Sequence, residues 1–432
     1  MTAELEYRVF PIRVMLAVDP MQLVDLVGLQ LYDSYEVNET GRAPSLSILR
    51  LLYSVLLFGG YLVGFYKSIE DIALSDQSAH SPSIFKYALM TQVYSGILGA
   101  VICYAFLWRA DRMKCVYIEG IQFSSTKIND RYFQFRNMLV PSKQSIIVPI
   151  SLAMLLGLSV WEAYAQYMNE SYFTIIAVIY PLWMFHVTIL EFITMVKSTE
   201  CILTKLNWML DAFLENVQKQ TLPGINNKGK DTKRSITKVH PASRRPFVHE
   251  NELISGERLT YMFVIHENVA KLAEFINGAY SLQIIAIVTV TFVNTLFGFF
   301  IETKLLFWNY QMLELIFRAC RYAFECIPAC LVIYYMLIVC ASTHTELFKS
   351  SSLLHKLLQY KSNYFIDDQA LFERSKAIAL QLLHRKRFSL FDGSGLFKLD
   401  FTFIFSIFSA ATSYLIVLLQ FDLSKDLESA TM

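Results

Sequence analysis

The chain has 432 residues and a net charge of +1; 54% of its residues are hydrophobic and 17% are charged. A soluble protein of this length carries more charge, and a nucleic-acid-binding protein carries a clear positive excess, so we expect neither. The seven cysteines lack the Cys-x-x-Cys spacing of a metal site, and we expect no metal or other cofactor. The sequence has no zinc-protease, phosphate-loop or nucleophile-elbow motif, which argues against an enzyme.

Seven stretches of the sequence are apolar over about the twenty residues that a membrane span needs. The fold class we expect is therefore an all-α membrane protein with seven transmembrane helices. The first twenty residues contain no apolar signal region, so the first span is expected to direct insertion. The predicted spans are 48–66, 87–108, 145–168, 173–196, 279–301, 318–341 and 401–421.

The distribution of Lys and Arg among the loops predicts the orientation of these spans. The loops after spans 2, 4 and 6 are rich in basic residues, whereas the loop after span 5 has little beyond Lys304 and the C-terminal tail has only Lys425. Basic loops face the cytosol, so we expect a cytosolic N-terminus and an extracellular C-terminus. The glycosylation sequon at Asn169 then lies outside, close to the membrane, and the sequon at Asn38 lies inside, where it stays unmodified.

The loops have helical character of their own. Residues 198–218, 256–278, 343–361 and 368–387 show helical or amphipathic periodicity, which predicts a helical bundle below the membrane, packed between subunits. The expected organisation is a cytosolic N-terminal segment 1–47, spans 1–4 in 48–196, cytosolic extensions 197–278 with a disordered insert 219–255, spans 5–6 in 279–341, anchor helices 342–400, span 7 in 401–421 and an extracellular tail 422–432.

The last span contains no charge, but it carries a polar seam. This seam consists of Thr402, Ser406, Ser409, Ser413 and Gln420, whose spacings of about one or two helical turns place them on one face. Small hydroxyl residues commonly let two helices pack closely in a membrane. A row of hydroxyls with one amide also suits the lining of an aqueous pore. The spacing alone leaves both interpretations open, with close packing the commoner one.

The end of this span resembles the signature of insect gustatory receptors, which is Thr-Tyr, five apolar residues and Gln-Phe. Here the segment runs from Ser413 to Phe421, with Ser413 where threonine is usual. The resemblance implies a ligand-gated, weakly selective cation channel in the plasma membrane of a sensory neuron. It also implies a homotetramer, or a heterotetramer with related subunits, in which Ser413, Val417, Gln420 and Phe421 lie in the pore or its gate. Further similarity to the family lies in Phe391, Gly393, Gly395, Leu396, Phe397 and Asp400, and in His266, Leu272 and Asn277.

The resemblance also implies a ligand pocket that opens outward among the first six spans. Aromatic and ionisable residues in the outer halves of these spans are the candidates, because ionisable groups are costly in a membrane and aromatic walls suit a small polar ligand. Aromatic residues at helix ends are also common interfacial anchors, and charged residues one turn apart form intrahelical ion pairs. The candidate ligand-binding residues are Trp161, Glu162, Tyr180, Trp183, Arg321 and Glu325.

The expected partners are a small-molecule tastant, the lipid bilayer and permeant cations. Leu415 follows the signature tyrosine where the main sugar-sensing branch usually has Glu, so a fructose-type sugar or a bitter compound is expected instead. An odorant receptor subunit is one alternative. A secondary transporter is an alternative of another class, and it predicts internal repeats and spans broken near mid-membrane.

Overall fold

The computed structural model describes residues 48–75, 90–107, 147–169, 172–221, 256–307, 312–359 and 390–431, with a few isolated residues between these ranges. The predicted N-terminal segment 1–47, the sequon at Asn38 and most of the insert 219–255 lie outside the described residues. The described chain is almost wholly helical. Its helices are α3 (Ile48–Ser75), a helix at Met90–Leu107, α5 (Ile147–Asn169), α6 (Tyr172–Thr221), α7 (Gly256–Phe307), α8 (Met312–Gln359) and α11 (Phe401–Thr431).

These seven helices coincide with the seven predicted spans. Among the described residues, six of them are long and apolar enough to cross a membrane, and α5 holds a shorter apolar stretch at Ile147–Trp161. The all-α multi-pass fold is thus confirmed. In the structure α6 continues to Thr221 and α11 continues to Thr431, beyond the ends of the predicted spans.

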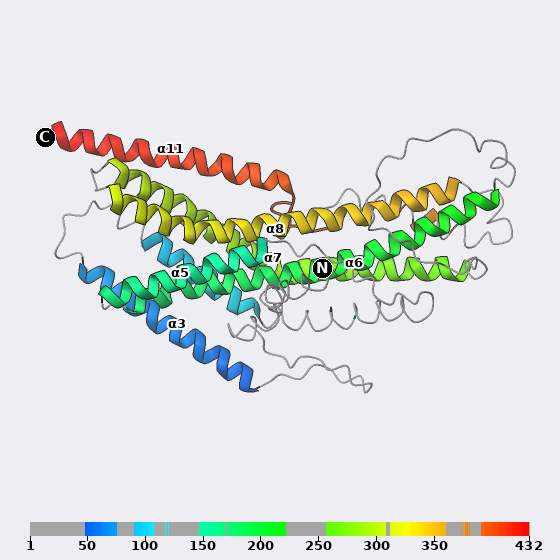
Figure 1. Ribbon diagram of the computed structural model, residues 1–432, viewed down its shortest axis with the longest axis horizontal. Helices are drawn as coiled ribbons and strands as arrows, with labels where there is room; N and C mark the ends of the chain where they lie inside the picture. The colour runs from blue at the N-terminus through cyan, green and yellow to red at the C-terminus, as the bar shows by residue number, and fades with distance from the viewer. Residues whose placement is uncertain are drawn as a thin grey trace, which may run out of the picture.

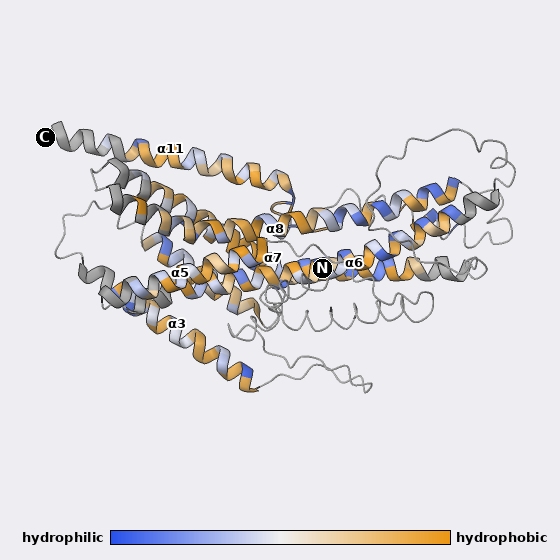
Figure 2. Ribbon diagram, viewed as in Figure 1, coloured by the Kyte–Doolittle hydropathy of each residue, from blue (hydrophilic) through white to orange (hydrophobic). Residues whose placement is uncertain are grey.

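Three helices are much longer than a bilayer is thick. α6, α7 and α8 contain 50, 52 and 48 residues, so each is roughly 70–80 Å long at 1.5 Å per residue. A hydrocarbon core of about 30 Å holds less than half of this length. The three helices run on together at one end of the bundle (Figure 1), and this end carries more hydrophilic residues than the middle does (Figure 2). The predicted helical extensions of spans 4, 5 and 6 therefore exist as continuations of the spans.

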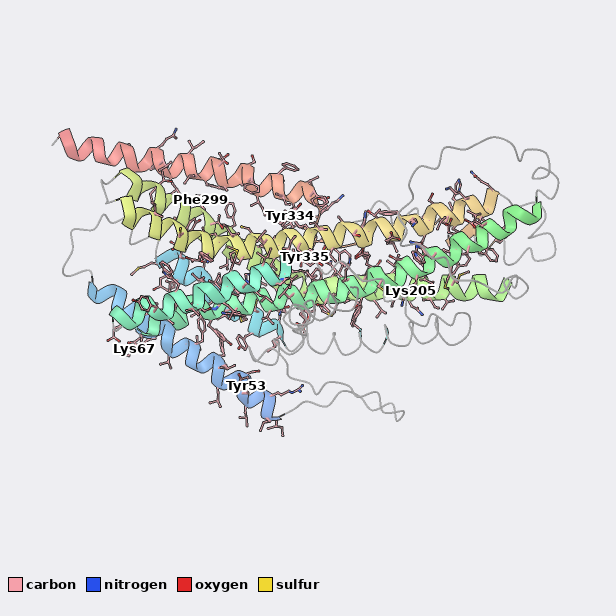
Figure 3. All side chains as sticks on the ribbon, in the orientation of Figure 1. Tyr53, Lys67, Lys205, Phe299, Tyr334 and Tyr335 are labelled. Atoms are coloured by element: carbon pink, nitrogen blue, oxygen red, sulfur yellow. The ribbon has the colours of Figure 1, made fainter. Side chains whose placement is uncertain are left out.

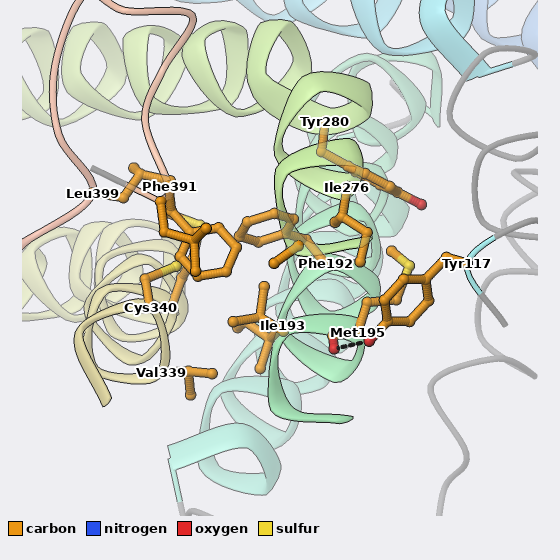
Figure 4. Packing of buried hydrophobic residues seen from close by; sticks show 14 of the residues in the cluster. Tyr117, Phe192, Ile193, Met195, Ile276, Tyr280, Val339, Cys340, Phe391 and Leu399 are labelled. Carbon is orange, nitrogen blue, oxygen red and sulfur yellow. Dashed lines mark hydrogen bonds between the residues drawn. The ribbon is translucent and has the colours of Figure 1, made fainter. Parts of the chain in front are cut away.

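The core lies where α6, α7 and α8 meet. Phe192 of α6 contacts Tyr280 of α7 with ring centroids 5.9 Å apart, and it meets Phe391, from the segment before α11, edge-on at 6.0 Å. All three side chains are at most 2% exposed. Figure 4 shows them packed with Ile193, Ile276 and Cys340 into one apolar cluster. The segment that leads into α11 is therefore part of the core of the subunit.

A buried tyrosine joins this core to a segment between the second and third predicted spans. The hydroxyl of Tyr117 donates a hydrogen bond of 2.5 Å to the carbonyl oxygen of Met195, drawn in Figure 4, and lies 2.7 Å from the hydroxyl of Thr199. Burial raises the pKa of Tyr117 above its ordinary value, so the hydroxyl stays protonated and remains a donor. Tyr117 thus fixes this segment to α6.

A polar group of three residues holds α6 to α8 in the extended part. The side-chain amide of Asn207, which is fully buried, donates to the carbonyl oxygen of Glu346 at 2.7 Å and to its carboxylate at 2.8 Å. The hydroxyl of Ser350 donates to the Asn207 side-chain oxygen at 2.5 Å. One turn or so away, Ser342 donates to the carboxylate of Glu200 at 2.6 Å. These bonds stabilise one axial alignment of α6 and α8, because a shift of either helix along its axis would separate the bonded groups.

Asn207→Ala should destabilise the protein by about 1–3 kcal/mol, because it leaves Glu346 and Ser350 of α8 without their partner in a buried interface. The measurement is the temperature at which the detergent-solubilised protein loses its monodisperse size-exclusion peak. Asn268→Ala, the same substitution at an exposed position of α7, is the control and should leave this temperature unchanged. Equal effects of the two substitutions would contradict the assignment.

Candidate functional site

Among the described helices, α11 is the least buried. None of the residues in its apolar window Phe401–Phe421 is buried within the chain. It packs along one edge of the bundle against α7 and, less extensively, against α8 (Figure 1). Large apolar side chains stay exposed along it, among them Phe405 at 75% and Phe408 at 68%. A helix of this composition needs a further apolar environment, either lipid or another protein surface.

The predicted polar seam lies on the exposed side of α11. The face toward α7 and α8 is formed by half-buried residues such as Ile404, Ile407 and Ala411. The seam is on the opposite face of the helix and all five of its residues, Thr402, Ser406, Ser409, Ser413 and Gln420, are exposed. The seam therefore does not pack this helix against its own subunit, and close packing within the subunit is not its role.

Two hydroxyls of the seam are satisfied within the helix itself. Ser406 donates to the carbonyl oxygen of Thr402 at 3.1 Å, and Ser413 donates to that of Ser409 at 2.9 Å. Such bonds one turn back leave each hydroxyl oxygen able to accept a hydrogen bond from outside. The seam thus presents a row of weak, neutral acceptors.

The base of α11 is fixed to α7 by a two-point hydrogen-bonded pair. The side-chain amide of Asn277 donates to the carboxylate of Asp392 at 3.1 Å, and the backbone N–H of Asp392 donates back to the Asn277 side-chain oxygen at 3.1 Å. Ser394 adds a hydrogen bond of 2.8 Å to the hydroxyl of Ser281 on α7. Asn277 and the residues on either side of Asp392 belong to the similarity to insect gustatory receptors given in the sequence analysis. In the structure, Asn277 and Asp392 are hydrogen-bonded to each other.

The turn before α11 requires its glycines. Ser394 and Gly395 have positive φ angles of 49° and 78°, a region that favours glycine. A Cβ atom at Gly393 would lie 2.6 Å from the ring of Phe397, so only glycine fits there. The carboxylate of Asp400 then caps α11 by accepting a hydrogen bond of 2.9 Å from the backbone N–H of Thr402. The turn sets the direction in which α11 leaves the core.

Ring contacts hold α11 along its length. Phe397 stacks on Phe403 with centroids 4.1 Å apart, and Tyr334 of α8, labelled in Figure 3, contacts Phe401 at 6.5 Å. Further along, Phe292 of α7 meets Tyr414 edge-on at 6.4 Å. The tyrosine of the signature therefore faces the subunit, while Ser413 beside it faces away.

The six predicted ligand residues do not form one cluster among the described side chains. Tyr180 is half-buried and hydrogen-bonds to Tyr104, whereas Trp183, about one turn along α6, donates from its indole N–H to Ser159 of α5 at 2.9 Å. Trp161 is 40% exposed, and Glu325 is half-buried and makes interactions of its own. The side chains of Glu162 and Arg321 lie outside the described residues. Their assignment as ligand-binding residues stays a prediction.

Sequence reasoning missed a polar junction that joins three helices. The amide of Gln92 donates to the carbonyl oxygen of Asn294 on α7 at 3.2 Å, and Ser95 donates to the side-chain oxygen of Asn294 at 3.2 Å. Tyr322 of α8 donates a hydrogen bond of 2.5 Å to the carbonyl oxygen of Thr295, the residue that follows Asn294 on α7. The signal that could have indicated Asn294 was a side-chain amide inside a largely apolar span.

Long apolar helices that share one core define a multi-pass membrane protein. The sequence model of the family described as 7tm Chemosensory receptor matches residues 26–425. The chain belongs to this family, so it is a receptor and not an enzyme.

Known relatives refine this assignment. The chain is 34% identical over 173 residues to gustatory and pheromone receptor 33a of Drosophila melanogaster, covering 39% of this chain and 36% of that protein. It is 25% identical over 205 residues to the Drosophila melanogaster gustatory receptor for bitter taste 66a, covering 43% and 37%. The alignments thus span about a third of the length of these relatives. The fold is similar to that of the olfactory receptor OR5 from Machilis hrabei in complex with eugenol, with a TM-score of 0.55, 14% identity and coverage of 93% and 96%.

The pair at the base of α11 can be tested by exchanging its partners. Asn277→Asp should lower thermal stability, because it places a second carboxylate about 3 Å from Asp392. Adding Asp392→Asn to that variant restores an amide opposite a carboxylate, so the double variant should recover most of the loss. The measurement is the melting temperature of the solubilised protein for both single variants and the double variant. Additive losses in the double variant would contradict the pairing.

Proposed function

We propose that this chain is a subunit of a tetrameric, ligand-gated cation channel that a small tastant opens in the plasma membrane of a sensory neuron. The observation that carries the proposal is the exposed polar seam of α11, opposite the face that packs on α7 and α8. Four copies of α11 around an axis would turn their seams toward one another. The large apolar residues beside each seam, such as Phe405 and Phe408, would then contact neighbouring subunits or lipid.

The alternative environment for the seam is lipid, which is less favourable. The hydroxyls of Ser406 and Ser413 bond to their own helix and tolerate hydrocarbon at small cost. The amide of Gln420 is exposed and has two donors and an acceptor that hydrocarbon cannot satisfy. An aqueous pore satisfies this amide. This argument supports Ser413, Val417, Gln420 and Phe421 as residues of the pore or its gate.

The proposed topology has the long extensions of α6, α7 and α8 in the cytosol. Lys197, Lys205 and Lys349 lie on these extensions, in agreement with the excess of basic residues on the cytosolic side. The extensions from four subunits would form the shared anchor below the membrane. The C-terminus then lies outside.

The proposed ligand is a tastant that enters from the outside into a pocket among the first six spans. The names of the Drosophila relatives mention bitter taste and a pheromone, which favours a bitter compound over a fructose-type sugar. The fold similarity to OR5 keeps an odorant receptor subunit as the second candidate. The signature residues Gln420 and Phe421 favour the gustatory branch.

Cells that express this chain should pass an inward, weakly selective cation current when a bitter compound or sugar from a panel is applied, recorded in whole-cell mode. Gln420→Ala should change the relative permeability of sodium and potassium, or of larger organic cations, because it removes the one amide of the seam. Thr412→Ala is the matched control, since Thr412 is an exposed hydroxyl residue of α11 outside the seam.

The current experiment has two discriminating outcomes. A ligand-evoked current with altered permeability in the Gln420 variant and unaltered permeability in the Thr412 variant supports the channel and its pore helix. A surface-expressed chain that passes no current, either alone or with co-expressed related subunits, contradicts the proposal and points back to a transporter.

An epitope tag after Met432 should bind antibody on intact cells, because the proposed topology puts the end of α11 outside. A tag placed at position 235, in the loop between α6 and α7, should require permeabilised cells. Fluorescence of live and permeabilised cells measures both. The reverse labelling pattern would contradict the topology and the extracellular location of the gate.

A further inference from the structure

Three tyrosines from three helices meet inside the bundle. Tyr61 of α3 packs on Tyr180 of α6 with ring centroids 5.3 Å apart, and Phe58 of α3 packs on Tyr104 of the helix Met90–Leu107 at 4.4 Å. The hydroxyls of Tyr104 and Tyr180 are hydrogen-bonded to each other. We call these four residues, Phe58, Tyr61, Tyr104 and Tyr180, the phenol cluster. All four are neutral and aromatic.

The hydroxyl of Tyr61 has no hydrogen-bond partner in the described part of the chain, although the side chain is only 1% exposed. A buried hydroxyl without a partner costs about 1–3 kcal/mol, so such a group calls for an explanation. The hydroxyl of Ser68, two turns further along the same face of α3, is likewise buried and without a partner among the described residues. The described residues that pack against this face of α3 therefore supply too few hydrogen-bond acceptors for its hydroxyls.

The phenol cluster lies on the inward side of α3, behind the face of this helix that is turned toward lipid. α3 is an outer helix (Figure 3), and its outward face exposes Leu56 at 73% and Val63 at 60%. Tyr61 lies near the middle of the candidate span Ile48–Glu70, so the surface beside it is at hydrocarbon depth. Phe58, Tyr104 and Tyr180 are only half-buried, so the cluster is not sealed within the core.

We propose that the phenol cluster binds a neutral lipophilic molecule that enters from the bilayer and carries one acceptor oxygen, a hydroxyl or a carbonyl. Its oxygen accepts the hydrogen bond that Tyr61 lacks, and its apolar part packs on Phe58 and the tyrosine rings. A charged ligand does not fit, because the cluster contains no counter-ion. Tyr180 is also a candidate residue of the outward-opening pocket, and the route of entry from the bilayer is what distinguishes this site from that pocket.

The test uses the full-length protein in lipid nanodiscs and a long-chain alcohol that carries a photoreactive diazirine. After illumination, mass spectrometry identifies the labelled peptides, and unlabelled decanol or undecane is added as a competitor. We expect labelling on α3 and on the helix Met90–Leu107, displaced by decanol and much less by undecane, which has the same number of heavy atoms but no oxygen. Tyr61→Phe should raise the decanol concentration needed for displacement about five- to tenfold, the value of one hydrogen bond.

Tyr66→Phe is the matched control, since Tyr66 is on the same helix and is 68% exposed. It should leave decanol displacement unchanged. Equal displacement by decanol and undecane, or the same displacement in Tyr61→Phe as in the unmodified chain, overturns the proposal and leaves the cluster as ordinary helix packing. Because the readout is binding, a negative result here is distinguishable from a failure of the proposed channel function.

Discussion

The structure depends on one constraint: α11 is attached firmly at its base and only loosely along its length. At the base, Asn277 and Asp392 bind each other at two points, and Phe391 is inserted into the core against Phe192. Beyond the turn, α11 contacts its own subunit through one face only, and nothing in its apolar window is buried. The attachment at the base therefore sets the direction of α11. The surroundings of its exposed faces must come from outside this chain.

This constraint explains why the sequence of α11 has two sides. Half-buried residues such as Ile404 and Ile407 form the apolar contact with α7 and α8. The seam residues are exposed and face away from α7 and α8, so their choice reflects another surface. In the proposed tetramer this surface is the pore. A helix with few fixed contacts also changes its tilt at low cost, which suits a gate.

Features with local periodicity could be predicted from the sequence. The seven helices follow from apolar blocks, and the face shared by Ser406, Ser409 and Ser413 follows from helical spacing alone. The continuity of α6, α7 and α8 through the membrane boundary was predicted in part, since each extension showed helical periodicity. The exact ends of α6 and α11 could not be predicted, because polar composition marks the end of an apolar stretch and not the end of a helical backbone.

Contacts between distant residues could not be predicted in the same way. Asn277 and Asp392 are 115 positions apart, and Asn207 and Glu346 are 139 positions apart, so their pairing depends on how the helices pack. The same limit applies to the candidate ligand residues. Tyr180 and Trp183 were grouped because both are aromatic and near one end of a span, yet Tyr180 faces Tyr104 and Trp183 faces Ser159. A one-turn separation places two side chains near each other without giving them a common neighbour.

The acidic residues near the base of α11 bear on the selectivity of the proposed pore. A ring of free carboxylates would favour cations strongly. The carboxylate of Asp392 accepts from Asn277, and that of Asp400 accepts from the backbone N–H of Thr402, so both have structural roles. The seam itself is neutral, and its hydroxyls act as weak acceptors. Such a lining replaces little of the hydration shell of an ion, and it distinguishes poorly between sodium and potassium. In the proposed pore, weak selectivity would follow from the chemistry of the seam, because Asp392 and Asp400 at its base are engaged in fixing the helix.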